Sequence, residues 1–318
     1  MAHDESMDRL VELSRDDSVV VWLDLLAPSA DDLENLGPLL GGQELHRLAI
    51  ESALSQRSRP RLARFTDHRM IHTRSTRFDD PDNPDDNRLG TTDITAFVFE
   101  TTLVTIRSDD GFALDPVREV WDDNADLAVH GVSFLLYGLL DTVIEGYLDV
   151  LDTLDVRISD LEDRLVASQT QIRAVQRGTF TQRRAVAELS RIVLPMNEVF
   201  GSLVRSASHP GDSTMTPYYQ DVYDHALRAT ERIDGLRDTI EAILSTGLAM
   251  QGNSLNETMK KLTAWAAIIA VPTGITGYFG QNVPFPGNGS ALGFWLSTVL
   301  LLGLGIGLWL SFKRRDWL

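Results

Sequence analysis

Neutral side chains recur along one side of a segment near the C-terminus, at the spacing of a helix. They are small or polar and follow one another by three or four residues: Asn256, Met259, Thr263, Ala266, Ala270, Thr273 and Gly277. Residues with this spacing share one face of a helix. Such a face can line a conduit for a polar solute, or it can pack closely against another helix in a membrane. The segment ends in Gly280, Gln281 and Asn282, which add polar groups at one end of this face.

Two apolar segments, 262–279 and 292–312, contain no charged residue. A helix of about 20 residues crosses a bilayer, so each segment can span a membrane. Basic residues stand at 260–261 before the first segment and at 313–315 after the second, whereas the loop 280–291 carries no charge. The positive-inside rule then places both chain ends in the cytoplasm and the loop outside. Two spans do not enclose a channel, so a pore requires a ring of copies.

The composition is acidic and free of cysteine. The 318 residues include 46 acids and 29 lysines and arginines, which gives a net charge of −17, and only Glu257 and Asp316 among the acids lie beyond Asn256. Such a surface repels nucleic acid and anionic lipid and attracts cations. A chain without cysteine has no disulfide, no thiolate zinc site and no cysteine nucleophile. The charged opening residues predict no cleavable signal peptide.

Residues 1–115 are predicted to form a cytoplasmic α/β head. Strand-like segments surround one with helical spacing, in the order 19–25, 31–55, 62–73 and 95–107. This alternation of β-branched runs with a helical pattern is typical of an α/β module. The acidic stretch 79–93 has many turn residues and no apolar period, so we interpret it as a solvated loop.

From residue 116 the pattern is helical, and 116–257 is predicted to be a cytoplasmic helical region. A seam with steps of three and four indicates one long amphipathic helix: Leu140, Val143, Tyr147, Val150, Leu154, Ile158, Leu161 and Leu165. A second helical stretch covers 179–207. No proline occurs between Pro217 and Pro272, so one helix of about 55 residues can run into the first span. The transmembrane domain is 258–318.

Several motifs together resemble one family. They are 256–263 (NETMKKLT), Pro272-Thr273, Gly277, Gly280-Gln281-Asn282 and, upstream, 218–225 (YYQDVYDH). These motifs are similar to the pore and stalk helix of the CorA-type divalent metal ion transporters. The hallmark of that family is Gly-Met-Asn, or another Gly-x-Asn in its ZntB branch. The resemblance extends over 22–318 and includes 59–61, 115–119 and 135–137.

The resemblance implies a fold, an assembly and a function. The fold is an α+β cytoplasmic head followed by long helices and two C-terminal transmembrane helices. Five copies form a funnel-shaped homopentameric channel in the cytoplasmic membrane, in contact with lipid and not with nucleic acid. The implied function is passive, gated transport of divalent cations, with Mg²⁺ uptake foremost and Co²⁺ or Ni²⁺ as further substrates. No phosphate-binding loop or Ser/His/Asp order is present, so we expect no enzyme.

The resemblance also implies a pore lined by the first span. Mg²⁺ gives up its water reluctantly, so the oxygens of Gly280 and Asn282, with Gln281 beside them, can hold an ion that is still hydrated. Further in, Thr273 adds a ring of hydroxyl groups.

The remaining pore positions follow the first span towards the cytoplasm. Met259 and Leu262 form a dry constriction that gates by dewetting, and Asn256 forms a polar ring at the exit. The family pattern has a bulky methionine where this chain has Ala270, so we expect the apolar gate to be wider or confined to Met259. Ala266 and Gly277 complete the lining.

A regulatory metal site is the least defined expectation. In the family, an Asp of the head faces an Asp of the stalk across a subunit interface, and the two hold Mg²⁺. Asp221 keeps the stalk position, but the head position is Ser52 here. We therefore expect the regulatory ligands among Asp221, Asp224 and Glu51. In the absence of a metal, Asp221 and Asp224 are simply acids in the first turn of a helix, where the dipole favours them.

Alternatives remain at this stage. The outer loop 283–289 is similar to the zinc-transporting ZntB branch, but zinc favours imidazole and thiolate, and neither occurs in 257–318. Mg²⁺ is therefore favoured over Zn²⁺. His68 and His72 lie four residues apart in a strand-like stretch without a third ligand nearby, so we interpret them as solvated histidines and not as a zinc site. A membrane-tethered scaffold or signalling protein would have the same spans without needing the polar seam, and a membrane hydrolase built on Asp221, Asp224 and Glu51 is the weaker rival.

Overall fold

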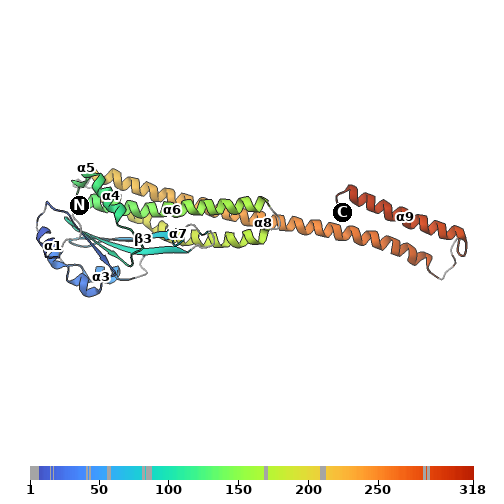
Figure 1. Cartoon of the computed structure of the whole chain (residues 1–318), viewed down its shortest axis with the longest axis horizontal. Helices are drawn as coiled ribbons and strands as arrows, with labels where there is room; N and C mark the ends of the chain where they lie inside the picture. Colours follow the sequence, from blue (N-terminus) through green and yellow to red (C-terminus); the bar gives the residue numbers. More distant parts are fainter. Residues whose placement is uncertain are drawn as a thin grey trace. The chain divides into compact units, whose positions relative to one another are not determined.

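The structure is a computed structural model, which describes residues 7–14, 16, 18–40, 42, 44–55, 59–80, 83, 88–167, 171–207, 213–281, 284 and 287–318. The chain divides into two compact units, Met1–Ile243 and Leu244–Leu318. The described elements, shown in Figure 1, are α1 (Met7–Leu13), β1 (Val21–Leu26), α2 (Ala30–Glu34), η1 (Gly37–Leu40), α3 (Arg47–Ala53), β2 (Arg61–Arg64), β3 (Arg69–Phe78), β4 (Leu89–Val98), β5 (Thr102–Arg107), α4 (Asp115–Asp123), α5 (Ala125–Ala128), α6 (Val132–Ala167), α7 (Ile172–Ala207), η3 (Ser213–Met215), α8 (Thr216–Phe279) and α9 (Ala291–Arg314).

The first unit contains a five-stranded sheet with the strand order β1-β5-β4-β3-β2. β2 to β5 pair antiparallel in sequence order, and β1 pairs parallel with β5. The predicted strands in 19–25, 62–73 and 95–107 are confirmed, but the last two segments each contain a turn and form two strands. The turns are closed by the Phe65 N–H, which donates to His68 O at 2.9 Å, and by the Phe99 N–H, which donates to Thr102 O at 2.9 Å.

Two predicted boundaries in the head are wrong. The helical stretch 31–55 is interrupted and forms α2, η1 and α3, because Gly37 and Pro38 interrupt the helical pattern. The loop predicted over 79–93 ends earlier, since β4 begins at Leu89. The residues at the start of β4 pair with β3 through polar partners such as Thr76 and Thr91, and such pairs stabilise a strand without giving an apolar period.

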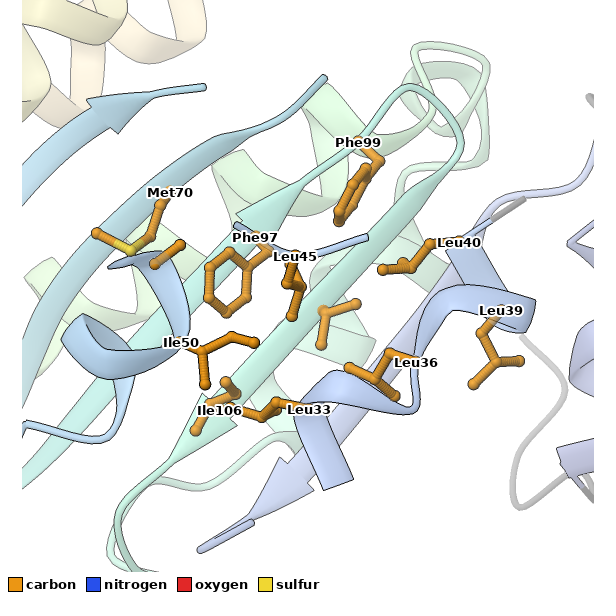
Figure 2. Packing of buried hydrophobic residues seen from close by; sticks show 12 residues of the cluster. Leu33, Leu36, Leu39, Leu40, Leu45, Ile50, Met70, Phe97, Phe99 and Ile106 are labelled. Carbon is orange, nitrogen blue, oxygen red and sulfur yellow. The ribbon is translucent and has the colours of Figure 1, made fainter. Parts of the chain in front are cut away.

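One face of the sheet packs against the short helices α2, η1 and α3. Figure 2 shows this core, with Met70 and Phe97 of the sheet directed towards side chains of the short helices. Its buried members are Leu33, Leu36, Leu39, Leu40, Leu45, Ala49, Ile50, Met70, Phe97, Phe99, Val104 and Ile106. Ser29 and Asp32 form a capping box that fixes the start of α2, so the first turn of this short helix is satisfied locally.

The opposite face of the sheet carries α6 and α7. The Tyr147 hydroxyl of α6 donates to Arg74 O of β3 at 2.5 Å, and the Thr73 hydroxyl of β3 donates to Met196 Sδ of α7 at 3.3 Å. Met70 and Thr73 stand on opposite sides of β3, as expected from the alternation of side chains along a strand. The sheet is thus one layer between two layers of helices.

The helices α6, α7 and the first part of α8 pack on one another. All eight residues of the predicted α6 seam are buried, which confirms one long amphipathic helix. Polar bonds join the three helices: Asn197 Nδ2 donates to Thr230 Oγ1 at 2.9 Å, Arg232 donates to Asp152 at 2.6 Å, and the Tyr219 hydroxyl donates to Ser133 O at 2.7 Å. α7 begins at Ile172, before the predicted 179.

The second unit consists of the last part of α8 and of α9. The prediction that one helix continues to residue 279 is confirmed, with Pro272 inside it. Both helices are long and apolar enough to cross a membrane, with a mean hydropathy of 1.4 for the best window of α8 and 2.0 for that of α9. Ser290 caps α9, because its hydroxyl accepts from the Gly293 N–H, and Lys313 and Arg314 stand in its last turn, where the helix dipole favours positive charge.

The buried hydrogen bond from Tyr147 of α6 to Arg74 O of β3 leads to a prediction about the stability of the first unit. Tyr147→Phe keeps the ring but removes the hydroxyl donor, so we expect a loss of about 1–2 kcal/mol in the free energy of unfolding. Each kcal/mol lowers the melting temperature of a unit of this size by about 2–4 °C. Tyr223→Phe, at a half-buried tyrosine of α8, is the matched control and should change it little. Equal melting temperatures for both variants would show that the bond does not hold α6 on the sheet.

Candidate functional site

The neutral seam of α8 is exposed along its whole length. The exposed residues include every predicted lining position that the structure describes: Asn256, Met259, Leu262, Thr263, Ala266, Ala270, Thr273, Gly277, Gly280 and Gln281. Asn282 lies outside the described residues. The seam therefore makes no packing surface within the chain, which was one of its two possible roles.

The opposite side of α8 is the packed one. Ala264 is fully buried, and Ile268, Val271 and Ile275 are partly buried. Each residue of a helix is rotated by about 100° from the one before, so these residues lie roughly opposite the seam. Within the second unit, α8 thus has a packing side and an open side.

The partner of the packing side is α9. Its buried or half-buried residues also recur by three or four: Gly293, Ser297, Leu301, Gly305 and Leu308. A cavity of about 420 Å³ is lined by residues of both helices, among them Ile275 and Phe279 of α8 and Ser297 and Leu301 of α9.

The threonines of the seam present oxygen lone pairs outward. The Thr263 hydroxyl donates to Met259 O at 2.8 Å, and the Thr273 hydroxyl donates to Ile269 O at 2.8 Å. Each hydroxyl hydrogen is therefore used within the helix, while the oxygen can still accept. An exposed hydroxyl oxygen whose hydrogen is already donated within the helix can accept a contact from a cation, or from the water around a cation. It has no hydrogen left to donate to an anion.

The end of α8 has the same polarity. Gly280 N–H donates to Thr276 O at 2.9 Å and closes the last turn. The last carbonyls of a helix have no helical donor and form the negative end of its dipole. The predicted residues Gly280 and Gln281 stand at this end, where carbonyl and amide oxygens attract a cation.

At the other end of the seam, the C-terminal tail comes beside α8. A cavity of about 490 Å³ is lined by Asn253, Asn256, Glu257, Met259, Lys260, Thr263 and Trp317. Trp317 also stacks on Phe312 with 5.5 Å between ring centroids. The sequence indicated the basic tail but not that Trp317 lines the same cavity as the start of the seam, because two residues about 60 apart in the chain share no local pattern.

The three predicted regulatory acids are not brought together within the chain. Glu51 lies on α3, exposed, with Arg47 Nε at 3.4 Å from its carboxylate. Asp221 and Asp224 lie on α8, where His225 Nε2 is 3.8 Å from Asp221 and Gln220 Nε2 donates to Asp224 at 2.9 Å. In the part of the chain that the structure describes, no three His, Asp or Glu residues are placed to hold a metal ion. Their regulatory role stays a prediction.

Ser52, the residue at the head position of the family's paired acids, is engaged elsewhere. Its hydroxyl accepts a hydrogen bond from the Arg61 guanidinium of β2. A positive group therefore stands where the family's second carboxylate is expected. This arrangement lowers the attraction of that position for a cation.

Sequence reasoning missed Asp141 of α6, which faces α8 near Asp221. Burial raises the pKa of Asp141 to about 6, with a further rise from Glu145 and Asp221 and an opposing effect from His225 and from the bond with Tyr137. The spacing of Tyr137, Asp141 and Glu145 by four puts them on one face of α6, a visible signal. The spacing does not predict that this face lies near Asp221, because that proximity depends on how α6 and α8 pack.

Known proteins with a similar sequence or fold are transporters of metal ions. A family model described as "CorA-like Mg2+ transporter protein" matches residues 17–314. The chain is 26% identical over 307 residues to the cobalt/magnesium transport protein CorA of Thermotoga maritima, covering 96% of this chain and 85% of that protein. It is also 26% identical over 304 residues to the zinc transport protein ZntB of Yersinia pseudotuberculosis, covering 93% and 88%.

Among solved structures, the fold is similar to that of the complete CorA magnesium transporter from Methanocaldococcus jannaschii. The TM-score is 0.75 at 23% sequence identity, and the match covers 93% of this chain and 91% of that one. This similarity confirms the predicted α/β head, long helices and two C-terminal apolar helices.

The pKa of Asp141 gives a pH-dependent prediction. Because this pKa is raised from 3.8 to about 6 in the folded chain, the folded state binds the proton more tightly than the unfolded state. Stability from this group therefore rises as the pH falls from about 7 towards 4. Asp141→Asn should raise the melting temperature at pH 7.5 in EDTA and have little effect at pH 4.5.

The size of this effect is limited by solvent. The rise of the Asp141 pKa from 3.8 to about 6 corresponds to at most about 3 kcal/mol of stability, and solvent screening at this partly exposed carboxyl reduces the effect to about 1 kcal/mol. Asp149→Asn, at an exposed acid of the same helix, is the control. A melting temperature of Asp141→Asn that stays below that of the control at pH 7.5 would contradict the assignment.

Proposed function

Because the chain belongs to the family of CorA-like Mg²⁺ transporter proteins, we propose that it carries divalent metal cations passively across a membrane, with Mg²⁺ as its main substrate. Membership in a family of transporters agrees with the expectation that the chain is not an enzyme. The driving force is the membrane potential, worth about 2.3 kcal/mol per charge for each 100 mV.

The observation that carries this proposal is the exposed, neutral seam of α8. An exposed row of hydroxyl, amide and small side chains is costly against lipid, because polar groups in hydrocarbon lose their partners. α9 packs on the side of α8 opposite the seam, so α9 does not cover these polar groups. The seam is therefore satisfied if it faces water and other copies of α8.

The assembly that we propose is a homopentamer in the cytoplasmic membrane. Two spans in each chain do not enclose a pore, so copies of α8 must form a ring around it, with α9 outside towards lipid. Large apolar side chains of α9 support this placement, since Leu292, Trp295, Val299 and Ile306 are more than half exposed. Basic residues next to both spans, and none in the loop 280–291, support an orientation with both chain ends in the cytoplasm.

At the outer mouth, we assign ion selection to Gly280, Gln281 and Asn282. The oxygens of Gly280 and Gln281 stand next to the negative end of the α8 dipole, and in this proposal they and Asn282 hold the water of a hydrated Mg²⁺. Neutral ligands attract the ion less than carboxylates do and so release it quickly, which conduction requires. Thr273 then offers its outward hydroxyl oxygen along the path.

Lower along α8, the proposed gate is formed by Met259 and Leu262. Their side chains are 58% and 62% exposed in the single chain. In a ring they would face one another and exclude water, which stops a hydrated ion. Asn256 and the neighbouring Trp317 stand at the cytoplasmic exit.

Regulation by cytoplasmic cations would act at the acidic stalk. We propose Asp221, with Asp224 and with Glu51 of an adjacent copy, as ligands, and Asp141 as a nearby contributor. The raised pKa of Asp141 reflects the cost of keeping its negative charge, and a bound divalent cation would relieve that cost.

A second candidate substrate is Zn²⁺. A zinc transport protein and a cobalt/magnesium transport protein have the same sequence identity to this chain, 26%. Against this candidate, the seam and the outer loop contain no histidine or cysteine, which are the preferred zinc ligands. Flux of Mg²⁺, Zn²⁺, Co²⁺ and Ni²⁺ into liposomes that contain one preparation of the chain decides between them. We expect Mg²⁺ to enter fastest; flux of Zn²⁺ alone would favour the second candidate, and flux of neither would reject transport.

The outer motif gives a sharper prediction. Asn282→Ala should lower Mg²⁺ uptake at least about tenfold, because one lost charge-assisted contact in each copy costs more than 1.4 kcal/mol. The control is Asn288→Ala, an exposed asparagine of the same loop, which should transport as the unaltered chain does. Size-exclusion chromatography should give the same oligomer for both. Unaltered flux in Asn282→Ala would remove this residue from the pathway.

A further inference from the structure

A pocket of the first unit is lined by arginines in an otherwise acidic chain. Its volume is about 360 Å³, and its lining consists of Arg59, Pro60, Arg74, Ser190, Arg191, Ile192, Leu194 and Pro195. Three of these eight residues are arginines and none is an acid, although the chain as a whole has a net charge of −17. The pocket lies where the segment before β2, the strand β3 and the helix α7 meet.

The positive charge of this pocket is only partly balanced. Arg74 Nε donates to Asp93 at 2.6 Å, and this is its only ion pair with a carboxylate among the described residues. Over that same part of the chain, neither Arg59 nor Arg191 pairs with an acid. Both are exposed at the surface, so two full positive charges and the remaining donors of Arg74 stand around one concave site.

The uncharged part of the lining gives the pocket a firm wall. Ser190 is 2% exposed, and its hydroxyl accepts from Arg237 Nη2 of α8 at 2.7 Å, which fixes this part of α7. Pro195 lies inside α7 and has no N–H, so it cannot donate to the carbonyl of Arg191 one turn earlier. Pro60, Leu194 and Pro195 add apolar surface beside the guanidinium groups.

This combination matches the chemistry of a phosphorylated small molecule. Guanidinium groups bind phosphate oxygens through paired, charge-assisted hydrogen bonds, which are stronger than neutral ones. The apolar wall suits the organic part of such a molecule, and the volume is at the lower end of small-ligand sites, about 300–1,000 Å³. We infer that the pocket formed by Arg59, Arg74 and Arg191 binds the phosphate groups of a soluble phosphate ester or polyphosphate. This site is separate from the proposed cation path.

The long-range field of the chain opposes an anion but does not prevent binding here. Charges further away than the Debye length, about 8 Å at 0.15 M salt, are largely screened. The arginines that line the pocket act at contact distance, so their attraction prevails locally. Affinity should therefore fall as the salt concentration rises, because the contacts are electrostatic.

The test is calorimetric titration of the full chain in detergent and metal-free buffer, at about 0.15 M salt, with inorganic phosphate, pyrophosphate and ATP in separate experiments. Pyrophosphate or ATP should bind more tightly than phosphate, because more oxygens reach the three arginines. If ATP binds more tightly than pyrophosphate, its base and sugar contact the apolar wall. No saturable binding of any of the three with a Kd below about 1 mM overturns the inference.

Variants distinguish binding in this pocket from non-specific attraction of anions to arginines elsewhere on the surface. Arg59→Gln and Arg191→Gln should each weaken binding about tenfold, and Arg191→Lys should lie between, since it keeps the charge but not the paired geometry. The control is Arg177→Gln, an exposed arginine of the same helix about 21 Å away along its axis, which should bind as the unaltered chain does. An equal loss in the control would also overturn the inference. Because binding is measured without transport, this result is independent of the proposed function.

Discussion

In the proposed pore, a divalent ion and a lipid bilayer impose opposite demands on the same helix. Hydrocarbon requires every backbone group to be bonded within the helix and the outward side chains to be apolar. The ion requires oxygen atoms, because losing its water without replacement costs far more than folding can supply. α8 meets both demands by dividing its surface. One side carries hydroxyl, amide and small groups, and the other packs on α9.

Local chemistry makes this division possible without charges. Thr263 and Thr273 use their hydroxyl hydrogens on carbonyls of the preceding turn, so they add oxygen acceptors to the surface without adding charge. The first unit is built on a different principle, with a sheet between two helical layers and acidic surfaces around it. α8 contributes to both units, and Asp221 and Asp141 lie on its stalk part and on the helix that packs there. Charge at this contact therefore acts directly on the helix that also carries the seam.

Much of this arrangement is readable from sequence because it is periodic. The buried seam of α6, the two apolar segments and the polar positions of α8 all repeat by three or four residues, and each such repeat maps onto one helix face. The strands were predictable as β-branched runs, but their turns at 65–68 and 99–101 were not, since they depend on single hydrogen bonds. The start of β4 was not predictable for a related reason, because its pairing with β3 includes polar partners such as Thr91 with Thr76 and Thr92 with Ser75.

The sequence alone does not predict which faces of the helices and strands pack together. Asp141 and Asp221 are 80 positions apart, and Trp317 and Asn256 are 61 apart, so their proximity follows only from packing. The arginine pocket is of the same kind, since Arg59, Arg74 and Arg191 belong to three separate elements. By contrast, the exposure of the seam follows from the position of α9, which leaves that side of α8 open.

The central claim, that the seam of α8 faces an aqueous path, is tested most directly by cysteine accessibility, since the chain has no cysteine of its own. Ala270→Cys places a thiol on the seam, and Ile268→Cys places one on the side that packs on α9. A water-soluble, positively charged thiol reagent should modify Ala270→Cys and block Mg²⁺ flux in liposomes, while Ile268→Cys keeps its flux. Modification of Ile268→Cys with an unreactive Ala270→Cys would contradict the account.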